Sequence, residues 1–148
     1  MNAEAIRERL TRSRASLLDA LTGLTERDFV AELEPGLTVA AALAALASAE
    51  RQSIREARRA AGAPERPLPA GGAPAAARAT PPQVVHDLAG ARYETALFLD
   101  LMSQGTPGAE VDAQTVQALL QAICDREAAA AEHVRARPWI GEHRASTA

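Results

Sequence analysis

Three charged residues in the middle of apolar helical patterns are the strongest candidates for a functional site. They are Glu50, Arg92 and Glu127. Counting 100° per residue places each of them on the apolar stripe of its own segment rather than on the polar face. An isolated buried charge costs on the order of several kcal/mol, so the three are expected to pair, with the arginine between the two carboxylates. Such a layer is either a buried ion network or a pocket for a small polar ligand.

Few other residues could carry out chemistry. No two of the three histidines are four residues apart, and no Glu-x-x-His pair occurs, so the usual ligand spacings of a metal site in a bundle are missing. A weak alternative site would combine His133 with Asp125 and Glu127. Cys124 is alone in an alanine-rich pattern, which predicts a small buried side chain rather than a nucleophile. No catalytic group can be assembled from these residues, and no cofactor is expected.

Four segments show the helical spacing that would position these side chains. They cover 6–24, 38–61, 81–105 and 112–138. Asn2 is expected to cap the first helix, and Thr80 and Gln83 are expected to form a capping box at the start of the third. The expected stripe of the first segment is Ile6, Leu10, Ser13, Leu17, Leu21 and Leu24. The inward residues expected in the third segment are Val85, Leu88, Leu99 and Met102.

The length and composition of the segment between the second and third helices predict how these two helices are oriented. Residues 62–80 are rich in Pro, Gly and Ala without periodicity, which is typical of an extended linker. At ~3.3 Å per residue these 19 residues can reach ~60 Å, further than the ~36 Å of the second helix, so the two helices can run parallel. The prediction is an all-α fold, a four-helix bundle in up-down-down-up order with a long crossover from helix two to helix three.

The chain is predicted to form a single domain over 1–148, with a flexible tail over 141–148. Trp139 and Ile140 are expected to fold back on the bundle end as an apolar plug, because an exposed Trp near a terminus is unusual without a partner. The alternative is that these two residues contact a second subunit.

Composition and charge exclude several classes of protein. The 148 residues are 47% hydrophobic and only 3% aromatic, with Ala and Leu in excess, which excludes an all-β fold. All sixteen basic residues are arginine, but the net charge is −3. Glu56 and Glu65 are interleaved with the arginines of the second helix, and no aromatic residues accompany them, so nucleic acid is not an expected partner. No apolar run approaches the ~20 residues of a membrane span, and the charged start does not suit a signal peptide. A cytoplasmic protein without a membrane partner is expected.

The stretch 33–50 and two shorter motifs resemble a known superfamily. The sequence Leu-Glu-Pro-Gly-Leu-Thr-Val-Ala begins at Leu33 and continues through an alanine-rich helix to Glu50. It resembles the DinB/YfiT-like superfamily, in which helix two opens with Gly-Trp-Ser-Val and continues through Leu and His to a Glu. Ala91-Arg92-Tyr93 and Asp125-Arg126-Glu127 are also similar, and the resemblance extends over nearly the whole chain.

The resemblance implies a dimeric four-helix bundle that holds a divalent metal, nickel or zinc. The metal ligands would be one His on helix two and two His four residues apart on helix four, and some members are thiol-dependent S-transferases or isomerases. In this chain Ala45 stands in place of the helix-two His, and Leu37 in place of the Trp. The places of the histidine pair are taken by Asp125 and Ala129, or, one residue further on, by Arg126 and Ala130.

The chain is therefore interpreted as a divergent DinB-like protein without the metal-binding histidines. Its expected function is that of a non-catalytic homodimer, a small-ligand-binding or structural module. The alternative is a divergent metal- or thiol-dependent enzyme, an S-transferase, isomerase or hydrolase, with nickel or zinc at Glu127, His133 and Asp125. Glu50, Arg92 and Glu127 would lie at the height where the superfamily keeps its metal.

Overall fold

The computed structural model describes residues 2–64, 80–105, 112–137 and 139–140. Its elements are α1 (Ala3–Leu21), α2 (Glu26–Phe29), β1 (Glu32–Glu34), β2 (Leu37–Thr38), α3 (Val39–Ala60), α4 (Pro81–Ser103) and α5 (Ala113–Arg135). Helices dominate, so the all-α prediction is confirmed. Most of the predicted linker 62–80 and the whole predicted tail 141–148 lie outside the described residues.

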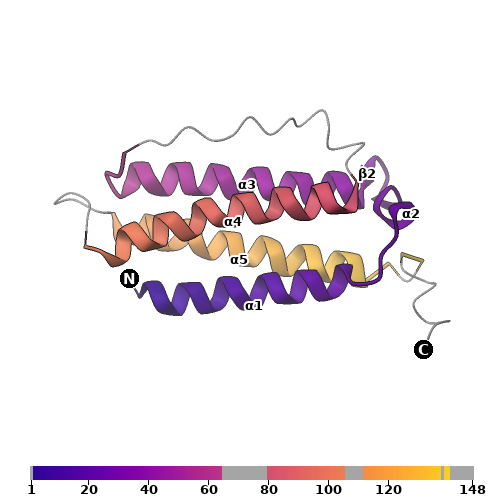
Figure 1. Ribbon diagram of the computed structural model, residues 1–148, viewed down its shortest axis with the longest axis horizontal. Helices are drawn as coiled ribbons and strands as arrows, with labels where there is room; N and C mark the ends of the chain where they lie inside the picture. Colours follow the sequence, from indigo (N-terminus) through magenta and orange to yellow (C-terminus); the bar gives the residue numbers. More distant parts are fainter. Residues whose placement is uncertain (1, 65–79, 106–111, 138, 141–148) are drawn as a thin grey trace.

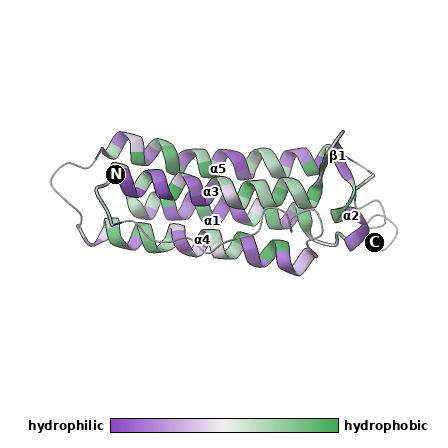
Figure 2. Cartoon of the chain, turned by 90° about the horizontal axis from the view of Figure 1, so that it is seen from above, coloured by the Kyte–Doolittle hydropathy of each residue, from purple (hydrophilic) through white to green (hydrophobic). Residues whose placement is uncertain are grey.

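Four long helices, α1, α3, α4 and α5, lie side by side along the long axis of the molecule (Figure 1). In this view α1 and α5 run from left to right, and α3 and α4 run from right to left. Apolar and polar stretches alternate along each of them (Figure 2), as expected for helices with one buried face. The packing is uneven, because α3 packs closely on α4 and α5, and α1 on α5, whereas α1 and α4 touch at few points. The seam between α1 and α4 is therefore the open one.

Each long helix begins at a residue whose side chain accepts a hydrogen bond from the first turn. Asn2 Oδ1 does so for α1 at 3.2 Å, and Thr38 and Asp112 do so for α3 and α5. The capping box predicted for α4 is confirmed, because Thr80 Oγ1 accepts from the Gln83 N–H at 3.4 Å and Gln83 Oε1 accepts from the Thr80 N–H at 2.9 Å. These bonds satisfy backbone donors that a helix start leaves without partners.

The segment between α1 and α3, most of which no predicted helix covers, contains α2, β1 and β2. Thr25 caps α2 in a capping box with Asp28, whose Oδ2 accepts from the Thr25 N–H at 2.8 Å. β1 and β2 then form an antiparallel hairpin, and its turn uses Gly36 at φ +83°, a conformation that favours glycine. These short elements are formed by local capping hydrogen bonds and a glycine turn, and they need no periodic pattern of apolar residues.

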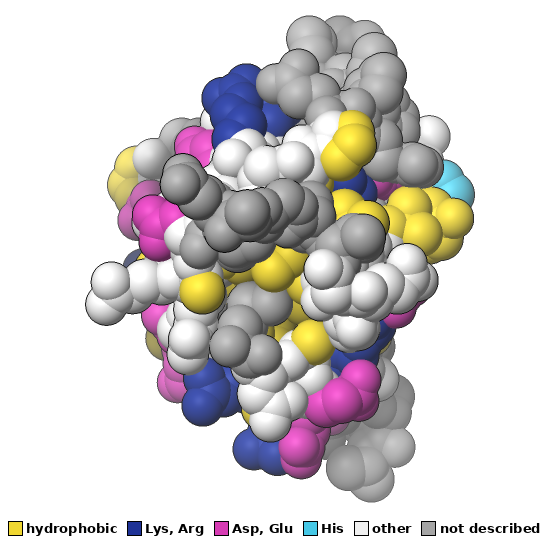
Figure 3. Space-filling view, turned by 90° about the vertical axis from the view of Figure 1, so that its left-hand side faces the viewer, with side chains coloured by type: hydrophobic (Ala, Val, Ile, Leu, Met, Phe, Trp, Pro, Cys, Tyr) yellow, Lys and Arg dark blue, Asp and Glu magenta, His cyan; other side chains and the backbone are white. Residues whose placement is uncertain are grey.

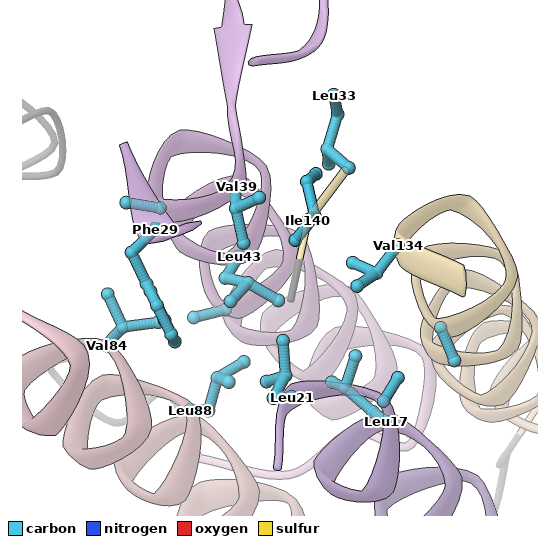
Figure 4. Packing of buried hydrophobic residues seen from close by; sticks show 14 of the residues in the cluster. Leu17, Leu21, Phe29, Leu33, Val39, Leu43, Val84, Leu88, Val134 and Ile140 are labelled. Carbon is cyan, nitrogen blue, oxygen red and sulfur yellow. The ribbon is translucent and has the colours of Figure 1, made fainter. Parts of the chain in front are cut away.

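Buried apolar side chains form two clusters toward opposite ends of the long helices. Figure 4 shows the hairpin-end cluster, in which Phe29 and Leu33, both 3% exposed, cover the helix ends. Leu88 of α4 is buried as predicted, but nearer the start of the helix the inward residue is Val84, at 3% exposed, and not the predicted Val85, which is 42% exposed. Val84 and Val85 lie four and three residues before Leu88, so both fit a helical period, and the sequence pattern alone could not choose between them.

The end of the described chain confirms half of the predicted apolar plug. Ile140 is 2% exposed and belongs to the hairpin-end cluster with Leu33 and Val134 (Figure 4). Trp139 was predicted to fold back with Ile140, but it is 53% exposed, and its ring lies 5.5 Å from the Arg137 guanidinium carbon. Adjacent side chains leave the backbone in different directions, so only one of the two enters the core.

The described surface carries mixed charges. Acidic and basic side chains are interspersed on the end of the molecule seen in Figure 3. Among the residues that the structure describes, no helix combines the length and apolarity needed to cross a bilayer.

The burial of Ile140 predicts a contribution to stability. Ile140→Ala should lower the free energy of unfolding by about 2–4 kcal/mol, because the truncation removes apolar burial and leaves a cavity. Trp139→Ala is the matched control, since it removes a larger but exposed side chain and should change the free energy of unfolding by less than about 1 kcal/mol. Urea denaturation measures both values. Equal losses would contradict the placement of Ile140 in the core.

Candidate functional site

The middle of the bundle holds a polar layer between the two apolar clusters. Glu50, Arg92 and Glu127, the three residues predicted from the sequence, meet there, and Arg14 joins them. Each comes from a different long helix, α3, α4, α5 and α1 respectively. On every one of these helices, the buried apolar residues before the layer belong to one cluster and those after it belong to the other.

Arg92 connects the two carboxylates. Its Nε donates to Glu50 Oε2 at 3.1 Å and its Nη2 donates to Glu50 Oε1 at 3.2 Å, which is a bidentate arrangement. The same Nη2 donates to Glu127 Oε1, and Nη1 donates to the carbonyl oxygen of Leu10 at 3.0 Å. Arg92 therefore ties α4 to α3, α5 and α1.

Arg14 is the member of the layer that the sequence analysis missed. Its Nε donates to Glu127 Oε2 at 2.7 Å, its Nη2 to Glu50 Oε1 at 3.4 Å, and its Nη1 to the carbonyl oxygen of Leu88 at 3.2 Å. The predicted stripe of the first helix passed through the neighbouring Ser13, which fits the period equally well. Charge balance could have indicated Arg14. Two buried carboxylates with one arginine leave a net charge of −1, and a second buried arginine removes it.

Two hydroxyl groups complete the contacts of the carboxylates. Thr95 Oγ1 donates to Glu50 Oε2 at 2.8 Å, and Ser13 Oγ donates to Glu127 Oε1 at 3.4 Å. Each of the four carboxylate oxygens thus accepts at least one hydrogen bond, and the Glu50 and Glu127 side chains are 4% and 0% exposed. Both carboxylates are buried and engaged by these donors, so neither is open to a substrate proton, as a general base must be.

Burial and ion pairing act in opposite directions on Arg92. Desolvation lowers the pKa of its guanidinium, but the hydrogen bonds and negative charges of Glu50 and Glu127 outweigh it, so the pKa lies above its ordinary value. Arg92 therefore stays charged. The layer is a closed set of two positive and two negative groups.

The residues at the positions that the resemblance assigns to metal ligands do not suit nickel or zinc. Ala45 and Ala129 have no donor atom and are exposed. Asp125 is also exposed and accepts a hydrogen bond from Gln121 Nε2 at 2.9 Å. In the shifted register, Arg126 is exposed and donates to Ser53 Oγ at 2.9 Å.

The alternative ligand set is also not assembled. Glu127 is fully buried against two arginines, whereas Asp125 is exposed on α5 and His133 is partly exposed further along the same helix. Over residues 2–64, 80–105, 112–137 and 139–140, no group of three or more His, Cys, Asp or Glu side chains could hold a metal ion. The donor set present therefore does not fit the metal that the resemblance implies.

Cys124 lies in the apolar cluster that contains Leu10 and Leu120, and it is 7% exposed. Burial raises the pKa of its thiol, which keeps the sulfur protonated at neutral pH. A buried neutral thiol is a poor nucleophile, so its environment agrees with the expected structural role.

A groove runs along the open seam between α1 and α4 and is called the α1–α4 groove below. It has a volume of about 460 Å³ and is lined by side chains of α1 from Arg7 to Leu18 and of α4 from Arg92 to Leu99. Arg14 and Arg92 belong to this lining, and their side chains are 13% and 19% exposed. The groove therefore borders the closed layer on its arginine side. Helical periodicity does not predict this groove.

No family model, curated protein or solved structure matches the chain. The site is therefore interpreted from its own residues and their geometry.

Removing one carboxylate from the layer should destabilise the protein. Glu127→Ala is expected to lower the free energy of unfolding by about 3–5 kcal/mol, because two largely buried arginines lose a partner. Glu50→Ala should lower it by about 2–4 kcal/mol, since Arg14 and Arg92 both keep Glu127, and the Arg14 contact with Glu50 is the longer of its two, at 3.4 Å against 2.7 Å. Denaturant unfolding followed by circular dichroism measures both changes.

The matched control for this prediction is Glu132→Ala on the same helix. The Glu132 side chain is 80% exposed and lies 3.7 Å from the Arg135 guanidinium. Exposed pairs of this kind contribute about 0–1 kcal/mol, so the control should remain close to wild type. A loss for Glu127→Ala as small as that of the control would show that the layer is open to water.

Proposed function

We propose that the protein is a non-catalytic small-ligand-binding module built on a divergent DinB/YfiT-like four-helix bundle. In this proposal the long helices follow the up-down-down-up order, with residues 62–80 as the crossover between α3 and α4. The directions of the long helices (Figure 1) and the resemblance of the stretch 33–50 support this assignment. The same resemblance supports a homodimer.

The observation that carries the proposal is the α1–α4 groove beside the closed charged layer. Its volume of about 460 Å³ falls within the ~300–1,000 Å³ typical of small-molecule sites. Its lining combines apolar side chains with a few convergent charged groups, which is the usual composition of a ligand pocket. The layer supplies these charged groups in fixed positions, because Arg14 and Arg92 are each held by both glutamates.

The same geometry argues against chemistry at this site. Catalysis needs an activated nucleophile, a tuned general base or an open metal position. Within the part of the chain that the structure describes, Glu50 and Glu127 are engaged by arginines and Cys124 is a buried thiol. Binding without chemistry is therefore favoured over a metal- or thiol-dependent transferase, isomerase or hydrolase.

Metal content separates the proposal from the enzyme alternative. Protein purified without chelator and dialysed against nickel or zinc should contain far less than one ion per chain by elemental analysis, because its donor set is incomplete. One ion per chain that is lost in His133→Ala but kept in His86→Ala would support the enzyme instead. His86 is a suitable control because it is an exposed histidine on α4, outside the alternative ligand set. Metal lost equally in both variants is surface-bound and supports the proposal.

Thermal unfolding with a panel of small acids, alcohols and amines tests ligand binding directly. A compound that binds only the folded state at 100 times its Kd stabilises it by about 2.7 kcal/mol and raises Tm. Ala15→Phe adds a ring to a residue that lines the groove and should abolish the rise. Ala45→Phe makes the same change at an exposed alanine of α3, outside the groove lining, and should keep it. No rise in the wild type, or the same rise in both variants, would contradict the proposal.

A further inference from the structure

The lining of the α1–α4 groove carries charges of one sign beside apolar surface. Arg7, Arg14 and Arg92 supply the charges, and none of the groove-lining residues in the described chain is acidic. The accessible apolar surface comes from Leu18, which is 40% exposed, and from the alanines of the lining, whereas Leu10 and Leu99 are 2% and 1% exposed. The groove therefore complements a ligand that has one negative group and an apolar part.

Arg14 and Arg92 keep donor capacity after forming the charged layer. A guanidinium group offers five N–H donors. Arg14 donates three hydrogen bonds and Arg92 donates four to partners within the described residues. Two N–H groups of Arg14 and one of Arg92 thus have no acceptor among those residues. Both side chains line the groove, so a ligand lying in it can accept from them.

The glutamates that balance these arginines lie further from the groove than the guanidinium groups do, so their repulsion of an anion is weaker than the attraction by the arginines. Glu50 and Glu127 are absent from the groove lining, and their side chains are 4% and 0% exposed. A ligand in the groove therefore meets guanidinium groups before it meets a carboxylate. Arg7 forms an ion pair with Asp100 that connects α1 to α4. This ion pair crosses the groove at its Arg7 end.

We propose that the α1–α4 groove binds carboxylic acids that carry a short apolar chain; this inference rests on the ligand-binding function proposed above. The carboxylate accepts hydrogen bonds from the free N–H groups of Arg14 and Arg92, and the chain lies against Leu18 and the alanines of the groove lining. An alcohol of the same length binds more weakly because it lacks the charge, and an amine is repelled by the guanidinium groups.

Isothermal titration calorimetry of the full chain with octanoate, octan-1-ol and octylamine tests this specificity. Octanoate should bind at one molecule per chain, octan-1-ol should bind at least about ten-fold more weakly, and octylamine should not bind detectably. Ala15→Phe should abolish octanoate binding, whereas Ala45→Phe should keep the wild-type Kd. Circular dichroism and light scattering establish that both variants keep the wild-type helicity and molecular mass.

Each other outcome overturns the inference in a distinct way. Equal affinity for octanoate and octan-1-ol would remove the preference for an acid, but it would leave the ligand-binding function intact. If octanoate does not bind, but another compound raises the Tm of the wild type and not that of Ala15→Phe, the acid preference is wrong and the ligand-binding function stands. If no compound raises the Tm of the wild type in this way, the proposed function fails together with the inference. A change of molecular mass in Ala15→Phe alone would assign the groove to a contact between two copies of the chain.

Discussion

The rest of the fold is arranged around four charges that share the middle of the core. Arg14, Glu50, Arg92 and Glu127 each stand at the point of their helix where one apolar cluster ends and the other begins. Sliding one helix by a single turn, ~5.4 Å, would place a charge among apolar side chains and leave its partners unpaired. Because desolvation offsets much of the attraction within a buried ion pair, we interpret the layer as a device for axial register more than for stability.

Sequence reasoning located three of these four residues for a physical reason. Glu50, Arg92 and Glu127 each interrupt an apolar stripe, and the phase of one helix is enough to reveal such an interruption. Arg14 was missed because Ser13 fits the same stripe, and choosing between them requires the charges on three other helices. Helix starts were predicted well because capping is local. The first inward residue of α4 was not, since Val84 and Val85 both satisfy its period.

The α1–α4 groove lies beyond the reach of such patterns. It depends on the distance between two helices. Small residues such as Ala15 and Ala96 do not reveal that distance in a chain where alanine occurs on every long helix. The metal-ligand position of the motif had a related weakness, because it falls on Ala45, which is exposed, while the buried charge of α3 is Glu50 at the end of the same motif. Position within a motif and position within the core are different properties, and only the three-dimensional arrangement relates them.

The division of the core also affects how the sequence can change over evolutionary time. The charged layer separates the leucines of one cluster from those of the other. The changes in the free energy of unfolding caused by substitutions in different clusters should therefore be additive. A volume lost near the hairpin cannot be refilled by a larger side chain at the opposite end. Substitutions in one cluster can therefore accumulate independently of the other, with lost volume compensated inside the same cluster. Only the four charged residues are constrained by the packing of both clusters.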